Sequence, residues 1–202
     1  LPRYLLLNTI NMIPKIVHYC WFGKGEMDEV SKKCIDSWKK YLVGYEFKLW
    51  NEDNFNVNET EYTKQAYQEQ QWAFVSDYVR CKVLYEYGGI YMDTDVEVFK
   101  SLDEFIHLPY VFKYRYTLPF DDAFFMVEKG NVILKKVLEH MSKSKFTNYS
   151  LFFALLLRYG KKQSEVCMIN KINDFINDNK IYTFSNEMFN LYIKHYENNS
   201  WK

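Results

Sequence analysis

The chain has 202 residues, a length that fits one domain, and its apolar content of 48% allows a sizeable core. Its 26 basic and 26 acidic residues give a formal net charge of zero, and no basic run carries interleaved aromatic residues, so no nucleic-acid partner is indicated. The longest purely apolar run, 151–157, is too short to cross a bilayer, which takes roughly 20 residues.

Strands and helices alternate along the chain. Short apolar or alternating runs predict strands at 15–21, 46–50, 90–93, 96–99, 123–127, 181–184 and 192–196. Apolar residues at helical spacing predict helices between Asp28 and Gly44 and at 72–87, 132–141 and 151–158. We interpret the polar stretch 51–60 as a loop and 96–99 as a hairpin-like continuation of the preceding strand. The alternation predicts an α/β fold without internal repeats.

The cysteines indicate the compartment. All four are scattered, without the spacing of a metal site: Cys20, Cys34, Cys81 and Cys167. We expect them to be small buried side chains in a reducing environment, and the protein to be cytoplasmic, with no signal peptide and no transmembrane segment.

Two carboxylates, Asp93 and Asp95, stand one residue apart where the predicted strand 90–93 ends. Paired carboxylates beside a buried strand are costly unless a positive charge lies next to them, and hard cations such as Mn²⁺ or Mg²⁺ prefer oxygen ligands. Ligands also gather at the carboxyl ends of strands in open α/β sheets. Because an acid-x-acid triplet is common, a solvated turn remains the alternative.

A second polar pair, Asp77 and Arg80, is three residues apart on one face of the predicted helix 72–87. Their apolar neighbours suggest a mostly buried helix, where Asp77 can accept hydrogen bonds from ribose hydroxyls and Arg80 can fork onto phosphate or carboxylate. An ordinary surface ion pair is the alternative.

Trp21 closes the first predicted strand, where its ring can stack on a nucleobase or pack in the core. Near the carboxyl end, His195, Glu197, Ser200 and Trp201 form a polar and aromatic cluster. By itself this segment is typical of a disordered tail.

Three stretches carry a family resemblance: IPKIVHYCWFG at 13–23, FVSDYVRCKVLYEYGGIYMDTDVEV at 74–98 and HYENNSW at 195–201. In this order they resemble the bacterial DXD-motif sugar-binding glycosyltransferases of capsular polysaccharide synthesis. That family is similar to yeast α-1,6-mannosyltransferases and clostridial toxin glucosyltransferase domains. The resemblance implies a GT-A-like nucleotide-sugar-binding fold with a central, mostly parallel sheet flanked by helices. It also implies a retaining transferase that uses Mn²⁺ or Mg²⁺.

The resemblance assigns roles in the first half of the chain. It implies that Trp21 stacks on the donor base and that Asp77 contacts donor hydroxyls. Arg80 would contact the donor sugar side, Asp93 would lie near the sugar and ribose, and Asp95 would bind the metal. Asp93, Asp95 and Arg80 are therefore the expected catalytic residues, and Asp93 also belongs to the expected metal set.

The resemblance also assigns the tail. Ser200 and Trp201 would cover the diphosphate, and Glu197 and Ser200 complete the expected metal set. We expect residues 12–202 to be one domain with a carboxy-terminal lid, preceded by an upstream extension at 1–11. Phe120–Phe124 and Asn148–Ser150 depart from the asparagine and the Thr-Gly-Pro turn of many relatives, which leaves the acceptor and the rate of transfer open.

The implied reaction moves a hexose-type sugar from a nucleotide-sugar, with a UDP-sugar favoured over a GDP-sugar, to a glycan or lipid-linked acceptor. Such an enzyme would lie in the cytoplasm or peripherally at the inner face of the membrane. One alternative is a haloacid-dehalogenase-type phosphatase, with Asp93 as nucleophile and Asp95 as general acid. Another is a catalytically degenerate nucleotide-sugar-binding protein.

Overall fold

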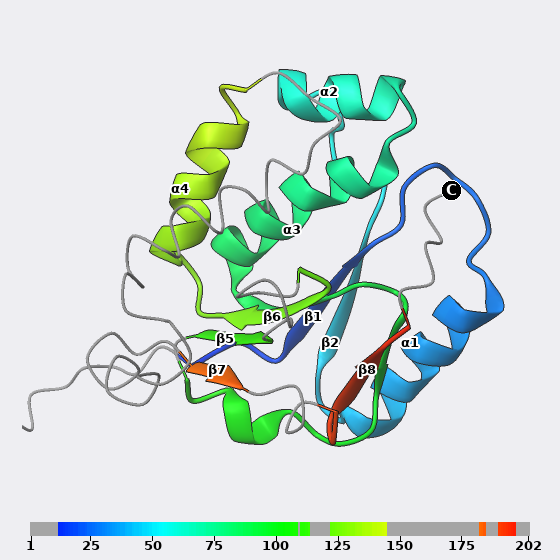
Figure 1. Ribbon diagram of the computed structural model, residues 1–202, viewed down its shortest axis with the longest axis vertical. Helices are drawn as coiled ribbons and strands as arrows, with labels where there is room; N and C mark the ends of the chain where they lie inside the picture. Colours follow the sequence, from blue (N-terminus) through cyan, green and yellow to red (C-terminus); the bar gives the residue numbers. More distant parts are fainter. Residues whose placement is uncertain (1–11, 109, 114–121, 145–181, 185–189, 197–202) are drawn as a thin grey trace, which may run out of the picture.

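The computed structural model describes residues 12–108, 110–113, 122–144, 182–184 and 190–196 (Figure 1). Its main sheet has the strand order β2-β1-β3-β6-β5-β7. These strands are β1 (Ile16–Cys20), β2 (Glu46–Trp50), β3 (Gly89–Met92), β5 (Tyr110–Lys113), β6 (Phe124–Val127) and β7 (Tyr182–Phe184). The pairs β1–β2, β1–β3 and β5–β7 are parallel, whereas β3–β6 and β5–β6 are antiparallel. The sheet is therefore mixed, with more parallel than antiparallel pairs.

Three of the four helices described begin at a residue whose side chain caps the helix. The four are α1 (Glu29–Tyr41), α2 (Glu61–Gln68), α3 (Trp72–Tyr87) and α4 (Val132–Met141), with a short 3₁₀ turn, η1, at Asp103–Phe105. The Asp28 side chain accepts a hydrogen bond from the Ser31 amide at 2.7 Å, as predicted for the cap of the first helix. Thr60 and Asn131 cap α2 and α4 in the same way. Helix α3 ends at Gly88, whose φ of +68° favours glycine.

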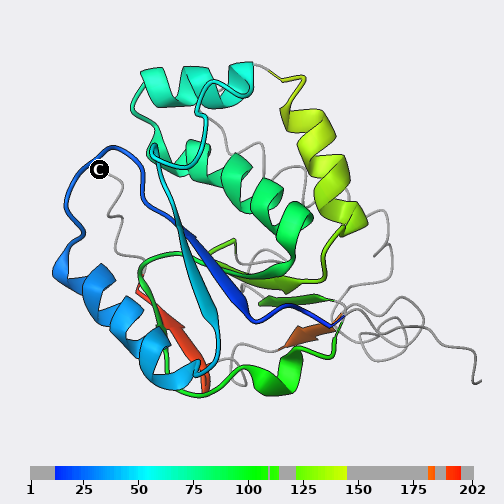
Figure 2. The ribbon, with the colours of Figure 1, turned by 180° about the vertical axis from the view of Figure 1, so that it is seen from behind.

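Alternating side chains divide the core into two halves, one on each face of the sheet. On β3, Tyr91 packs with α2, α3 and α4, whereas Ile90 and Met92 pack with α1 and η1. The same alternation on β6 places Phe125 on the first face and Phe124 on the second. Figures 1 and 2 show the result, with α2, α3 and α4 on one side of the sheet and α1 with β8 on the other.

A second, two-stranded sheet joins distant parts of the chain. Strand β4 (Val96–Val98) pairs antiparallel with β8 (Ile193–His195). The strand predicted at 96–99 is therefore present as β4, but its hairpin-like relation to the preceding strand is wrong. Helix α1 holds β4 in its place, because the Trp38 indole donates to the Val96 carbonyl at 2.6 Å and Ser37 Oγ accepts from the Val98 amide at 2.9 Å.

Most other predicted elements agree with the structure, including α3 and α4 at their predicted bounds. Helix α2 and strand β5 were not predicted; α2 has only three buried residues, Tyr62, Thr63 and Ala66, within a polar sequence. The predicted helix at 151–158 and the extension at 1–11 lie outside the described residues. Cys20, Cys34 and Cys81 are buried and free, as expected, and Cys167 lies outside the described part. Among the described residues, no helix is long and apolar enough to span a membrane.

Candidate metal and donor site

The acidic pair lies at the carboxyl end of a parallel strand. Asp93 directly follows β3, and its amide donates to the Ala123 carbonyl at 2.8 Å. A tight turn follows, in which the Val96 amide donates to the Asp93 carbonyl at 3.0 Å and brings Asp95 to the same side. Between the two acids, the buried Thr94 hydroxyl accepts from Ser31 Oγ of α1 at 3.2 Å. The turn is thus fixed to both the sheet and α1.

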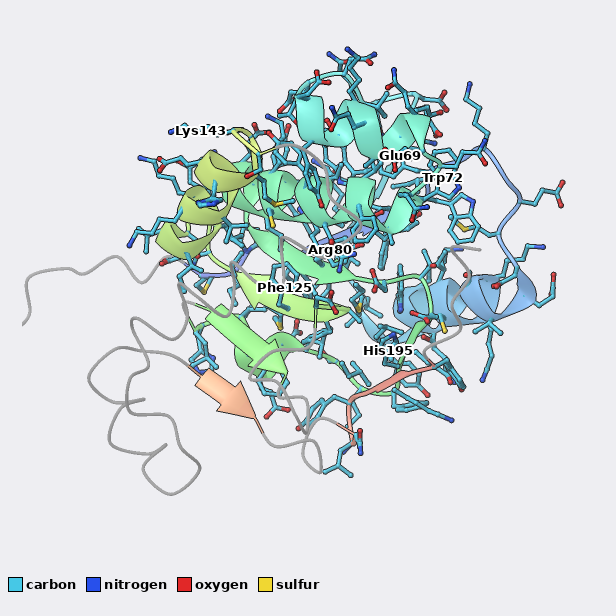
Figure 3. The ribbon with its side chains drawn as sticks, turned by 45° about the horizontal axis from the view of Figure 1, so that its top comes forward. Glu69, Trp72, Arg80, Phe125, Lys143 and His195 are labelled. Carbon is cyan, nitrogen blue, oxygen red and sulfur yellow. The ribbon has the colours of Figure 1, made fainter. Side chains whose placement is uncertain are left out.

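His195, labelled in Figure 3, completes a three-residue cluster with this pair. The β4–β8 register aligns Val96 with His195, and the Tyr196 amide donates to the Asp95 carbonyl at 3.1 Å. As a result, His195 Nε2 lies 3.3 Å from Asp95 Oδ1. Single ligand atoms of Asp93, Asp95 and His195 all lie within 4.8 Å of one another. The sequence predicts His195 only as part of a polar cluster near the carboxyl end. Its approach to Asp95 depends on the pairing of β8 with β4, which has no local sequence signal.

The geometry of this cluster fits a divalent cation. Ligands about 2.1 Å from an octahedral ion lie about 3 Å apart when adjacent and about 4.2 Å apart when opposite. The 3.3 Å between His195 Nε2 and Asp95 Oδ1 matches an adjacent pair of ligands, and ligand atoms of all three residues lie within 4.8 Å of one another. Its two carboxylates suit Mg²⁺ or Mn²⁺, and the imidazole favours Mn²⁺ because it is a softer ligand than oxygen.

Arg80 is the central cation beneath the acidic pair. It comes from α3 and is only 3% exposed. Its Nη2 lies 3.3 Å from Asp77 Oδ1 and 3.5 Å from Asp93 Oδ1, and its Nη1 donates to the Asp122 carbonyl at 2.7 Å. One guanidinium thus faces two buried carboxylates, so with both acids ionised these three groups carry a net negative charge. Asp95 adds a further negative charge. A bound cation would balance that charge.

Tyr91 fixes the orientation of Asp93. Its hydroxyl donates to Asp93 Oδ1 at 2.8 Å, and the Arg80 guanidinium lies 4.5 Å from the centre of its ring. Burial raises the pKa of Asp93 to about 6, while Arg80 and the Tyr91 hydrogen bond act in the opposite direction. Both protein donors approach the same carboxylate oxygen, Oδ1, and Tyr91 had not been singled out from the sequence.

Trp21 lies on a loop at the carboxyl end of β1, which is parallel to β3. Its indole donates to the Gly25 carbonyl at 2.7 Å, and the Gly23 amide donates to Glu52 Oε1 at 2.7 Å. Gly23 has a φ of +93° and lies so close to the Trp72 ring that a Cβ atom would come within 2.7 Å of it. This loop therefore holds the partly exposed Trp21 ring at the same edge of the sheet as Asp93.

The structure thus brings together Asp77, Arg80, Asp93 and Asp95 and places Trp21 at the end of the neighbouring strand. Glu197, Ser200 and Trp201, expected in the metal and donor sites, lie outside the described residues. The described chain ends at Tyr196, one residue from Glu197 and hydrogen-bonded to Asp95.

Comparison with known proteins supplies the context for this geometry. Residues 28–111 match the family model described as "Glycosyltransferase sugar-binding region containing DXD motif". The chain is 25% identical over 164 residues to inositol phosphoceramide mannosyltransferase 3 of Schizosaccharomyces pombe, covering 76% of this chain and 44% of that protein. It is 31% identical over 107 residues to a glycosyltransferase of Acanthamoeba polyphaga mimivirus, covering 50% and 43%. The chain therefore spans less than half the length of these relatives.

Solved structures share the fold. PaToxG glycosyltransferase superposes with a TM-score of 0.57 at 18% identity, covering 82% of this chain and 76% of that chain. A glycosyltransferase involved in glycosylation of the major capsid of PBCV-1 gives 0.50 at 13% identity, covering 93% and 95%. These findings confirm the family resemblance and the GT-A-like α/β fold predicted from the sequence.

Proposed function

Because residues 28–111 belong to the DXD-containing sugar-binding region of a glycosyltransferase family, we propose that the chain is a cation-dependent glycosyltransferase with a nucleotide-sugar donor. The observation that carries the proposal is the meeting of Asp93 and Asp95 with His195 at the carboxyl edge of the sheet. Helix α3 and strands β3 and β8 all contribute side chains there. A solvated turn with two acids would need no such convergence. The family match favours this function over the phosphatase alternative.

The bound cation would supply positive charge to the diphosphate as negative charge develops on the leaving group. Asp95 and His195 would hold it, with Asp93 beside them. We place Arg80 behind Asp93 rather than on the donor, since its Nη1 and Nη2 face protein groups. In this position Arg80 keeps the Asp93 carboxylate charged and oriented. Asp77 in turn holds Arg80 from the other side.

The donor would lie along the sheet edge between Trp21 and the acidic pair, with its base on the Trp21 ring. A UDP-sugar carrying a hexose is favoured, and the mannosyltransferase relative is consistent with a hexose. Glu197, Ser200 and Trp201 would close over the diphosphate, because the chain reaches them directly after Tyr196, which is bonded to Asp95.

Transfer would retain the anomeric configuration, with the leaving phosphate helping to deprotonate the acceptor. A glycan or lipid-linked acceptor of surface polysaccharide synthesis fits the family resemblance. Work on such an acceptor would place the protein in the cytoplasm or at the inner face of the membrane.

Calorimetry of uridine and guanosine diphosphate with and without Mn²⁺ tests the proposal. We expect tight binding of uridine diphosphate only with Mn²⁺, and loss of the Mn²⁺ effect in Asp95→Ala, because a carboxylate ligand is removed. Glu61→Ala, on the exposed first turn of α2, is the control and should bind as wild type does. Equal nucleotide affinity with and without Mn²⁺ in wild type would contradict the proposal.

Two further assays separate the alternatives. Hydrolysis or transfer from a UDP-hexose above background supports an active enzyme, whereas binding without turnover would indicate the degenerate protein. Phosphate release from an aryl phosphate with Mg²⁺ and no nucleotide would favour the phosphatase instead.

A further inference from the structure

We propose that Glu97 and Tyr196 are positioning residues that hold His195 against the cation site. Together with Lys33 they form a side-chain clasp between β4, the end of β8 and α1. The inference rests on the proposed metal site, because it assigns the groups that keep one of its ligands in place.

The clasp is a closed set of short polar contacts. The Tyr196 hydroxyl donates to Glu97 Oε2 at 2.5 Å. Lys33 Nζ lies 3.1 Å from both Glu97 Oε2 and the Tyr196 hydroxyl. Lys194 covers the Tyr196 ring, with its Nζ 4.3 Å from the ring centre. The residue after His195 is therefore bound to two other elements.

His195 needs such support because β8 is a weak element by itself. It has three residues, and β4 is its one strand partner in the described part of the chain. Two-stranded sheets are marginally stable, and a slip of one residue in register turns every side chain to the opposite face. A slip would therefore move His195 away from Asp95.

The clasp acts on the face opposite to the ligand. Side chains alternate along a strand, so Lys194 and Tyr196 lie on one face of β8 and His195 on the other. Glu97, aligned with Lys194, faces them from β4. Holding Tyr196 thus fixes the register of β8 without occupying the space around His195.

The far end of β8 supplies a matched control. There the Tyr192 hydroxyl donates to Glu104 Oε1 at 2.5 Å, and Lys100 Nζ lies 5.3 Å from the centre of the Tyr192 ring. Here too a tyrosine hydroxyl donates to a glutamate, but Tyr192 lies three residues from His195. Tyr192→Phe and Tyr196→Phe therefore remove the same hydroxyl from the two ends of one short strand.

The experiment measures Mn²⁺ binding to the full chain by the electron paramagnetic resonance signal of free Mn²⁺. We expect Tyr196→Phe and Glu97→Gln each to weaken Mn²⁺ binding about 10-fold, a typical effect of groups that orient a metal ligand. Tyr192→Phe should bind Mn²⁺ as wild type does, with a melting temperature close to that of Tyr196→Phe.

A double-mutant cycle with His195→Ala tests whether Tyr196 acts through the ligand. If it does, Tyr196→Phe causes no further loss of Mn²⁺ affinity once His195 is gone. Equal Mn²⁺ affinities of the Tyr192→Phe and Tyr196→Phe proteins, or an additive loss in the double variant, would overturn the clasp alone. Wild-type protein that binds no Mn²⁺ would overturn the metal site and the clasp together.

Discussion

His18 on β1 is a buried neutral histidine whose protonation should destabilise the fold. The side chain is 0% exposed. The Trp50 indole donates to its Nδ1 at 3.1 Å, so its Nε2 carries the proton donated to the Gly88 carbonyl at 3.0 Å. Burial lowers its pKa from 6.5 to about 4, with the Gly88 hydrogen bond opposing this shift. A second ring proton would point at the Trp50 N–H.

The sign and size of the effect follow from this pKa. Between pH 4 and 6.5 the unfolded chain binds more protons at His18 than the folded protein does, so stability is lost as pH falls through this range. A shift of about 2.5 units corresponds to about 3 kcal/mol in total. Between pH 7 and pH 5 the loss is about 2 kcal/mol.

Asp93 works in the opposite direction. Its pKa is raised from 3.8 to about 6, so the folded protein binds more protons there, and its contribution to stability grows as pH falls below 6. Between pH 7 and pH 5 this amounts to a gain of about 1 kcal/mol. The two groups partly cancel in the wild type, and only variants separate them.

Urea unfolding of wild type and a His18 variant at pH 7 and pH 5, with a chelator to remove metal ions, isolates the His18 effect. We expect His18→Gln to cost stability at pH 7, since two hydrogen bonds change, and then to lose about 2 kcal/mol less than wild type on acidification. His107→Gln, at an exposed position, is the control and should follow wild type. If His18→Gln and wild type lose the same free energy between the two pH values, the reasoning about a buried neutral His18 is refuted.

Three further substitutions test the loop that carries Trp21 and the backbone at two glycines. Trp21→Ala should weaken binding of uridine diphosphate with Mn²⁺ by about 1–3 kcal/mol, the scale of base stacking, with little change in melting temperature; a large fall in melting temperature would mark Trp21 as a core residue instead. Gly44→Ala should cost about 1–2 kcal/mol for its φ of +82°, since a Cβ atom there meets nothing within 4 Å. Gly89→Ala should cost several kcal/mol more in urea unfolding, because its Cβ would lie 2.5 Å from the Ile16 carbonyl oxygen; equal costs would contradict the steric argument.

Local signals in the sequence were enough for much of the fold. Three signals depend only on neighbouring residues: the helical spacing of apolar residues from Trp72, the helix end at Gly88 and the cap at Asp28. The structure has α1 and α3 where these signals predict them. The position of Asp93 at a strand end was predictable for the same reason. Asp77 and Arg80 could be placed together because three residues of a helix separate them.

Long-range pairing was not predictable from such signals. Strand β4 looked like a hairpin extension because its sequence neighbour is β3, yet its partner β8 lies almost 100 residues further on. No local signal in Val96–Val98 identifies that partner, since a three-residue strand with two valines can pair with many strand edges. The role of His195 was missed with it, because only the β4–β8 register brings the imidazole to Asp95.

The β4–β8 pairing also explains why Asp93 and Asp95 alone are an incomplete cation site, since it supplies His195. Asp93 is fixed by Arg80 of α3, by Tyr91 of β3 and by the Ala123 carbonyl just before β6, so its geometry does not depend on β8. Asp95 is fixed by its turn, but its partner His195 arrives only when β8 docks on β4. Cation binding should therefore stabilise the β4–β8 pair, since an ion held by both segments favours the state in which they are joined. It follows that docking of β8 on β4 and cation binding are cooperative, and that the complete site requires this pairing.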